Sequence, residues 1–195
     1  MSHNKPNTQP NLKWELLKTE HLVQDEWIDF RRLTYRMPDG SIFTPYYNYS
    51  RRNYVVIVAS DEAGRFLCVR QYRQGIGEVT TEFPAGGIEK AKDADDVSED
   101  AALAAAKREL QEETGYTSDD WHHLLTIPSD ATISDNYAHI YRAKNCRRVS
   151  GQNLDETEFL NAALLYKDEI ENLIQTGGFQ QAVHVMAWLL AERQA

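Results

Sequence analysis

The sequence predicts an α/β fold in which a mixed sheet lies between helices, preceded by an N-terminal antiparallel β unit. Three observations predict it. Segments typical of helices and of strands alternate irregularly along the chain, as they do in a sheet covered by helices. A continuous apolar run at residues 54–59 is typical of a strand buried on both faces. Aromatic and β-branched residues flank a Pro-Asp-Gly turn at residues 38–40, as in an antiparallel hairpin.

Length and composition exclude several classes of protein. The chain has 195 residues, of which 42% are hydrophobic, and its 21 basic and 30 acidic residues give a formal net charge of −9. This is the composition of one globular domain with at most a small appendage. An acidic chain is not typical of proteins that bind nucleic acid, whose surfaces are usually basic. An anionic small substrate is still compatible with it, because a bound metal reverses the local field.

The sequence shows no segment typical of membrane insertion or export. No apolar run approaches the roughly 20 residues that span a bilayer. The first eleven residues lack the hydrophobic core of a signal peptide. Cys68 and Cys146 have no metal-ligand spacing, and we interpret them as reduced thiols. We therefore expect a cytoplasmic protein that does not bind membranes.

The chain is expected to divide into a tail, a small β unit and a larger domain. Residues 1–11 are polar and carry two prolines, which predicts a disordered tail over residues 1–12. Residues 13–52 are expected to form the β unit, in which the turn at Met37–Ser41 leads into a second hairpin arm at residues 42–49. Residues 53–195 are expected to form the α/β domain.

The larger domain shows strand and helix signals in sequence order. The strand signals, rich in apolar and β-branched residues, lie at residues 54–59, 66–73, 79–83, 138–141 and 159–166. The helix signals lie at residues 99–114, 167–175 and 179–193. The first helix is the clearest, because alanine, leucine, glutamate, lysine and arginine run through it and Gly115 follows its end.

That first helix carries three glutamates near its C-terminal end. At about 100° per residue, Glu113 lies about 40° from Glu109 on the helix, and Glu112 about 60° from it. Acidic residues at this end oppose the helix dipole and repel one another, so helix stability does not explain them. Clustered carboxylates suit Mg²⁺ or Mn²⁺, which in turn bind phosphate oxygens. The alternative is a solvated acidic helix end.

Residues 108–116 read Arg-Glu-Leu-Gln-Glu-Glu-Thr-Gly-Tyr. They resemble the second half of the Nudix box, G-x5-E-x7-R-E-U-x-E-E-x-G-U, in which U is a bulky aliphatic residue. Residues 71–73 and 82–87 resemble the Q-Y-R and E-x-P-A-G segments of ADP-ribose pyrophosphatases, and the hairpin at Trp27 resembles their N-terminal strand unit. The resemblance extends over residues 13–193. It is to the Nudix hydrolase superfamily, closest to the ADP-ribose pyrophosphatase group, and it implies a Nudix-type α/β/α sandwich.

The first half of the box departs from the family pattern. Asp100 stands where the family has glutamate, and Ala94 stands where it has glycine. The box glycine is then Gly86 or Gly87, and about eight residues are inserted after it. We expect the polar segment 88–99 to be a surface excursion.

The resemblance implies a metal-dependent pyrophosphohydrolase that cleaves ADP-ribose to AMP and ribose 5-phosphate. Mg²⁺ or Mn²⁺ would be held by the side chains of Glu109, Glu112 and Glu113 and by the backbone carbonyl of Ala85. A related enzyme that cleaves GDP-mannose or another nucleoside diphosphate sugar is one alternative. A non-catalytic Nudix domain that senses a nucleotide is an alternative of another class, which the altered half of the box keeps open.

The resemblance also implies the remaining site residues. The catalytic residues are expected to be Glu156 as general base, Glu158 as base or further metal ligand, and Glu112. The substrate-binding residues are expected to be Trp27, Tyr46, Arg51, Arg73 and Glu82. Among these the arginines would bind phosphate, the aromatic residues would stack on adenine, and the glutamate would reach the terminal ribose. The N-terminal β unit is expected to support a homodimer with sites shared across its interface.

Overall fold

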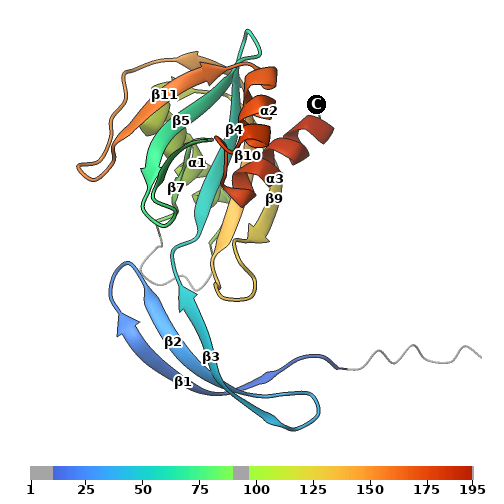
Figure 1. The fold of residues 1–195 in the computed structure, drawn as a ribbon. Coiled ribbons are helices and arrows are strands. Elements are labelled where there is room, and N and C mark those ends of the chain that lie inside the picture. Colours follow the sequence, from blue (N-terminus) through green and yellow to red (C-terminus); the bar gives the residue numbers. More distant parts are fainter. Residues whose placement is uncertain (1–10, 90–96, 195) are drawn as a thin grey trace, which may run out of the picture. The chain divides into compact units, whose positions relative to one another are not determined.

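The computed structural model of the protein describes residues 11–89 and 97–194 (Figure 1). Nearly all of the predicted tail and most of the predicted insertion at 88–99 therefore lie outside the described residues. The chain divides into two compact units. The first comprises the chain up to Arg51 together with Asp130–Asp135, and the second comprises Arg52–Ser129 and the chain from Asn136 onwards.

The first unit is a three-stranded antiparallel sheet in the order β1-β2-β3. Its strands are β1 (Glu15–Gln24), β2 (Asp29–Arg36) and β3 (Ile42–Ser50). The sequence predicted the β2–β3 hairpin, and Gly40 takes the positive φ of 87° that its turn requires. It did not reveal β1, which is exposed along nearly its whole length and mixes charged with apolar residues.

The second unit contains a mixed sheet in the order β11-β5-β4-β10-β8, to which three further strands add. Its strands are β4 (Tyr54–Asp61), β5 (Phe66–Arg73), β6 (Glu78–Glu82), β7 (Ala85–Gly87), β8 (Tyr116–Thr117), β9 (Asp120–Pro128), β10 (Tyr137–Arg148) and β11 (Leu160–Leu165). β4 and β10 are parallel, whereas the other paired strands are antiparallel.

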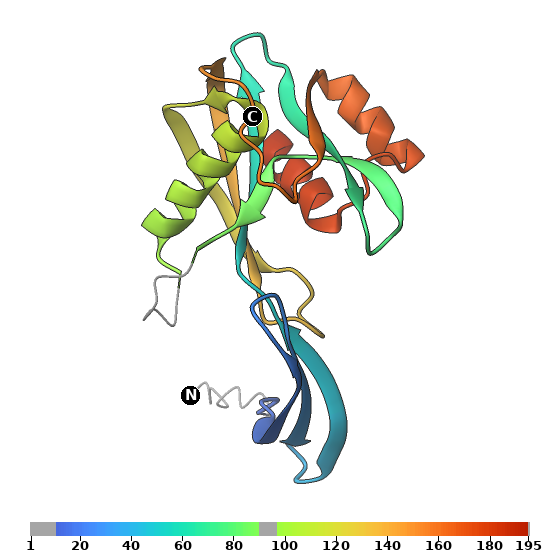
Figure 2. The ribbon, with the colours of Figure 1, turned by 90° about the vertical axis from the view of Figure 1, so that its left-hand side faces the viewer.

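Helices cover both faces of this sheet (Figures 1 and 2). They are α1 (Glu99–Thr114), α2 (Lys167–Thr176) and α3 (Ala182–Arg193). Val55 and Ile57 on β4 belong to a core cluster with Leu110 of α1, while the alternating Val56 belongs to a second cluster with Trp188 of α3. The buried central strand and the α/β/α sandwich predicted from the sequence are therefore confirmed. None of the described helices is long and apolar enough to cross a membrane.

The ends of α1 are set by local chemistry. The Ser98 hydroxyl oxygen accepts the Ala101 N–H at 3.2 Å, which caps the first turn. At the other end Gly115 adopts a φ of 77°, and its N–H donates to the Gln111 carbonyl at 2.8 Å. A Cβ on Gly115 would lie only 2.4 Å from the Ser150 carbonyl oxygen. Glycine therefore allows the chain after β10 to pass close to the end of α1.

Candidate functional site

Two of the three glutamates on α1 are buried. Glu109 and Glu113 are 5% and 2% exposed, whereas Glu112 is half-buried. Burial raises the pKa of Glu109, although Arg108 opposes this shift. Burial also raises the pKa of Glu113 well above its usual value, and the charges of Glu109 and Glu158 raise it further. The site therefore holds more negative charge than its surroundings neutralise, which favours a bound cation.

Arg108 joins two of the carboxylates to the segment that faces them. Its Nη1 donates to Glu112 at 2.7 Å, and its Nη2 donates to Glu109 at 2.7 Å and to the Gly87 carbonyl at 3.1 Å. The i,i+4 pair between Arg108 and Glu112 is common on helices. One guanidinium thus holds α1 against the end of β7.

The segment Pro84–Gly87 lies directly against these carboxylates. The Ala85 N–H donates to Glu113 Oε2 at 3.0 Å. A Cβ on Gly86 would lie 2.0 Å from the carboxyl carbon of Glu109, so only glycine lets the two elements approach this closely. The E-x-P-A-G pattern thus has a physical reason here, because it brings backbone groups to a buried carboxylate pair.

The donor types at this site fit a hard divalent cation. The carboxylates of Glu109, Glu112 and Glu113 and the carbonyl of Ala85 supply oxygen alone, which Mg²⁺ and Mn²⁺ prefer. Burial raises the pKa of Glu109 and of Glu113 because it disfavours their charged forms, and such an ion would stabilise those charged forms. Among the described residues, however, no three His, Cys, Asp or Glu side chains are already gathered at metal-binding spacing. Arg108 binds two of the glutamates instead.

The loop after β10 lies against the end of α1. The Asn153 N–H donates to the Glu112 carbonyl at 2.8 Å, and Gln152 Nε2 donates to the Glu113 carbonyl at 2.7 Å. Glu158, on the same loop, is half-buried, and its charge raises the pKa of both buried glutamates on α1. Glu156 is exposed. The structure therefore brings Glu158 toward the carboxylate pair and leaves Glu156 in solvent.

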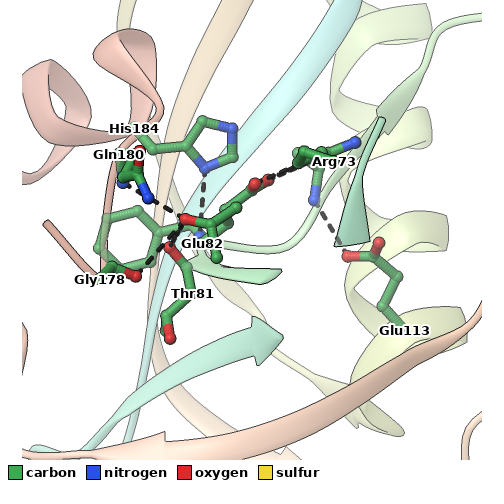
Figure 3. Close-up of polar contacts among 10 residues, drawn as sticks. Arg73, Thr81, Glu82, Glu113, Gly178, Gln180 and His184 are labelled. Atoms are coloured by element: carbon green, nitrogen blue, oxygen red, sulfur yellow. Dashed lines mark hydrogen bonds and ion pairs between the residues drawn. The ribbon is translucent and has the colours of Figure 1, made fainter. Parts of the chain in front are cut away.

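Arg73 and Glu82 form an ion pair beside the carboxylates (Figure 3). Arg73 Nε donates to Glu82 Oε1 at 2.9 Å, and Arg73 Nη2 donates to Glu82 Oε2. Glu82 is fully buried, and Arg73 is one-third exposed. Burial lowers the pKa of Arg73, but the hydrogen bonds and charge of Glu82 raise it by more. The pair uses one edge of the guanidinium, and within the described residues no hydrogen bond occupies Nη1.

The predicted nucleobase residues lie in the first unit. Trp27 is 69% exposed in the turn between β1 and β2. Tyr46 lines a cavity of about 410 Å³ together with Trp14, Tyr35 and residues 131–135. Trp27 does not line this cavity. The sequence therefore did not reveal that Tyr46 lies among other aromatic residues and beside a distant segment of the chain. Arg51, at the end of this unit, is exposed.

Two residues outside the predicted set bear on the site. Asp100, which replaces the box glutamate, is exposed in the first turn of α1, about 13 Å along the helix from Glu109. His184 on α3 is 3% exposed, and its Nδ1 accepts the Phe83 N–H at 3.2 Å. No sequence motif marks His184, and only its position among apolar residues of a helix distinguishes it.

Comparisons with known proteins support the resemblance of this chain to the Nudix family. A model of the NUDIX domain matches residues 50–189. The methanol dehydrogenase activator of Bacillus methanolicus is 31% identical over 116 residues, 59% of this chain and 58% of that protein. The ADP-ribose pyrophosphatase of Mycobacterium tuberculosis is 32% identical over 136 residues, 70% of this chain and 62% of that protein. The chain thus spans about three fifths of the length of these relatives.

A solved structure shares the fold. The crystal structure of an ADP compounds hydrolase aligns with a TM-score of 0.75 and 20% sequence identity. The alignment covers 93% of this chain and 94% of that one. Nearly the whole chain therefore has a counterpart in a known architecture.

Proposed function

Because the chain belongs to the NUDIX domain family, we propose that it is a divalent-metal-dependent hydrolase that cleaves ADP-ribose to AMP and ribose 5-phosphate. The observation that carries this proposal is the buried pair Glu109 and Glu113, which lies against the Ala85 backbone with Arg73 nearby. The ADP-ribose pyrophosphatase of M. tuberculosis, a relative by sequence, supports the choice of substrate.

The proposed ion is Mg²⁺ or Mn²⁺, held by Glu109, Glu112, Glu113 and the Ala85 carbonyl. When bound, such an ion neutralises charge on a diphosphate and lowers the pKa of an attacking water. The burial of Glu109 and Glu113 keeps competing water from their oxygens and so strengthens their attraction for a cation.

We infer that Glu158 is the general base and that Glu156 is the second candidate. The inference is supported by the position of Glu158, whose charge acts on Glu109 and Glu113, while Glu156 is exposed. A carboxylate beside the buried pair is placed to accept a proton from an attacking water.

The substrate would be held through its phosphates and its base. Arg73 presents Nη1 for a phosphate oxygen, and Arg51 would supply a second cation. Trp27 and Tyr46 offer aromatic faces for adenine. We retain the prediction that Glu82 reaches the terminal ribose, although in this structure its carboxylate is buried against Arg73.

We infer a cytoplasmic homodimer formed through the first unit. The inference is supported by the large apolar side chains that β1 and β3 expose, among them Leu16, Leu17, Leu22, Val23, Ile42 and Phe43. Exposed large apolar side chains in such number are typical of proteins with an interaction site. A monomer in sedimentation velocity would contradict this inference.

A panel of nucleotide sugars tests the proposed activity. The purified protein is incubated with Mg²⁺ and ADP-ribose or GDP-mannose, and the release of nucleoside monophosphate is followed. We expect ADP-ribose to be cleaved fastest. Faster release of GMP from GDP-mannose would overturn the substrate. Tight binding of ADP-ribose without turnover of any compound would favour the nucleotide-sensing alternative.

A further inference from the structure

The short segment between β6 and β7 connects several groups of the proposed site. The Glu82 carboxylate at its start binds Arg73, and the Ala85 N–H at its end donates to Glu113. Phe83 lies between them and is fully buried. The orientation of the Phe83 peptide therefore influences where Glu82 and Ala85 point.

His184 supplies the hydrogen-bond acceptor for that peptide. It lies in the first turn of α3, and its Nδ1 accepts the Phe83 N–H at 3.2 Å (Figure 3). An imidazole nitrogen accepts a hydrogen bond only when it carries no proton. Burial, with a smaller contribution from the charge of Arg73, lowers the pKa of His184 to about 3. The ring is therefore neutral and keeps this acceptor at physiological pH.

Packing alone does not orient the Phe83 peptide. The Phe83 ring contacts Phe179 and Trp188 at centroid distances of 5.1 and 6.2 Å, and it is nearly parallel to the His184 ring at 6.5 Å. These contacts pack the Phe83 ring against α3 and the residue Phe179 before it, but they do not fix the plane of the Phe83 peptide. The hydrogen bond to His184 adds a direction, because its geometry weakens steeply when the peptide plane rotates.

The linker between α2 and α3 forms further hydrogen bonds with β6, the strand that ends at Glu82. The Thr81 N–H donates to the Gly178 carbonyl at 2.9 Å, and the Gln180 N–H donates to Thr80 Oγ1 at 3.3 Å. Residues from Gly178 to His184 therefore lie alongside the chain from Thr80 to Phe83, which includes Glu82. This C-terminal region contacts β6 through both backbone and side-chain groups, including a hydrogen bond from Gln180 Nε2 to Glu78.

We propose that His184 is a positioning residue, which orients the Phe83 peptide and through it Glu82 with its partner Arg73 and Ala85 with its partner Glu113. The catalytic part of this inference rests on the proposed function. His184 would act without touching the substrate, so its loss should lower kcat more than it raises KM.

Three variants separate this role from general stability. His184→Leu places a methyl group where Nδ1 lies and removes the acceptor, whereas His184→Asn places an amide oxygen there and keeps it. Ala191→Gly weakens the same helix about two turns away and serves as the control. We expect His184→Leu to lower kcat for ADP-ribose by roughly tenfold or more, because small misplacements of reacting groups are costly. We expect His184→Asn to recover most of that loss, and Ala191→Gly to lower the melting temperature with kcat retained.

A second readout does not depend on turnover. Hydrogen exchange of the Phe83 amide should be slow in the wild type and in His184→Asn, and faster in His184→Leu. Nitrogen NMR of the wild type should show the His184 ring protonated on Nε2 alone, which tests the bond even if His184→Leu does not fold.

Three results would overturn the proposal. They are a proton on Nδ1 of His184, equal losses of kcat in His184→Leu and Ala191→Gly, and no recovery in His184→Asn. If the wild type cleaves no nucleotide sugar, the proposed function fails, and exchange of the Phe83 amide alone then decides the role of His184.

Discussion

At the scale of single residues, the site depends on burying carboxylates whose desolvation Arg108 and Arg73 offset only in part. Glu113 accepts a hydrogen bond from one backbone amide, and its pKa is raised well above the usual value. A buried anion without a full partner is destabilising, so its presence indicates a role other than holding the fold together. The same environment explains why a divalent ion would bind there.

Replacing Glu113 by glutamine tests that interpretation. Glu113→Gln keeps the shape of the side chain but removes the charge that would bind the ion, so turnover of ADP-ribose should fall by about 10²-fold or more. The melting temperature in EDTA should not fall, because no buried charge loses its partner. Calorimetric titration with Mn²⁺ should show weakened binding. Near-full turnover in this variant would show that the metal assignment is wrong.

Alanine substitutions at Gly86 and at its neighbour Gly87 test the close approach of β7 to α1, with Gly87 as the control. A methyl group at Gly86 would meet the Glu109 carboxylate at 2.0 Å, whereas at Gly87 the nearest atom lies 4.0 Å away on Arg52. Gly86→Ala should therefore lower the free energy of unfolding by about 1–3 kcal/mol and weaken Mn²⁺ binding, since the carboxylate must move. Gly87→Ala should change both far less. Similar urea midpoints for the two variants would contradict the geometry.

At the scale of elements, the sequence predicted those whose signals are local. The helix α1, the buried strand β4 and the β2–β3 hairpin carry clear periodicity, caps or turns. The strands β1 and β9 went unrecognised because they mix charged, polar and apolar residues, and because β1 is largely exposed and β9 mostly half-buried. Contacts such as His184 with Phe83 join residues about a hundred positions apart, so no local pattern indicates them.

The end of α1 offers a prediction at this scale. Gly115 and Gly64 have nearly the same positive φ, 77° and 76°, but only at Gly115 would a Cβ meet another atom, the Ser150 carbonyl oxygen. Both alanine variants carry the cost of the backbone conformation, about 1 kcal/mol. Gly115→Ala should lose at least about 1 kcal/mol more, because it also displaces the chain around Ser150. Chemical denaturation compares the two, and equal losses would show that this contact is unimportant.

At the scale of the whole molecule, stability should depend on pH through His184. The pKa of this residue falls from 6.5 to about 3 in the fold, so below pH 6.5 the unfolded chain takes up a proton that the folded chain does not. Its contribution to stability is therefore complete above pH 6.5 and is lost as the pH falls toward 3, by up to about 1.4 kcal/mol per pH unit.

Urea unfolding at pH 7.5, 6.5 and 5.5 measures this dependence. The wild type should lose stability more steeply below pH 6.5 than His184→Asn, which has no titrating ring. All other titrating groups are shared, so the difference between the two curves isolates this histidine. Parallel curves would show that His184 has the same pKa in the folded protein as in the unfolded chain.

The most direct test of the account is a time course of ADP-ribose hydrolysis by the wild-type protein with Mg²⁺, with EDTA, and by Glu113→Gln with Mg²⁺. The account predicts equal amounts of AMP and ribose 5-phosphate from the wild type with Mg²⁺, and little of either in the other two reactions. No AMP from the wild type, or the same rate in all three reactions, would contradict it.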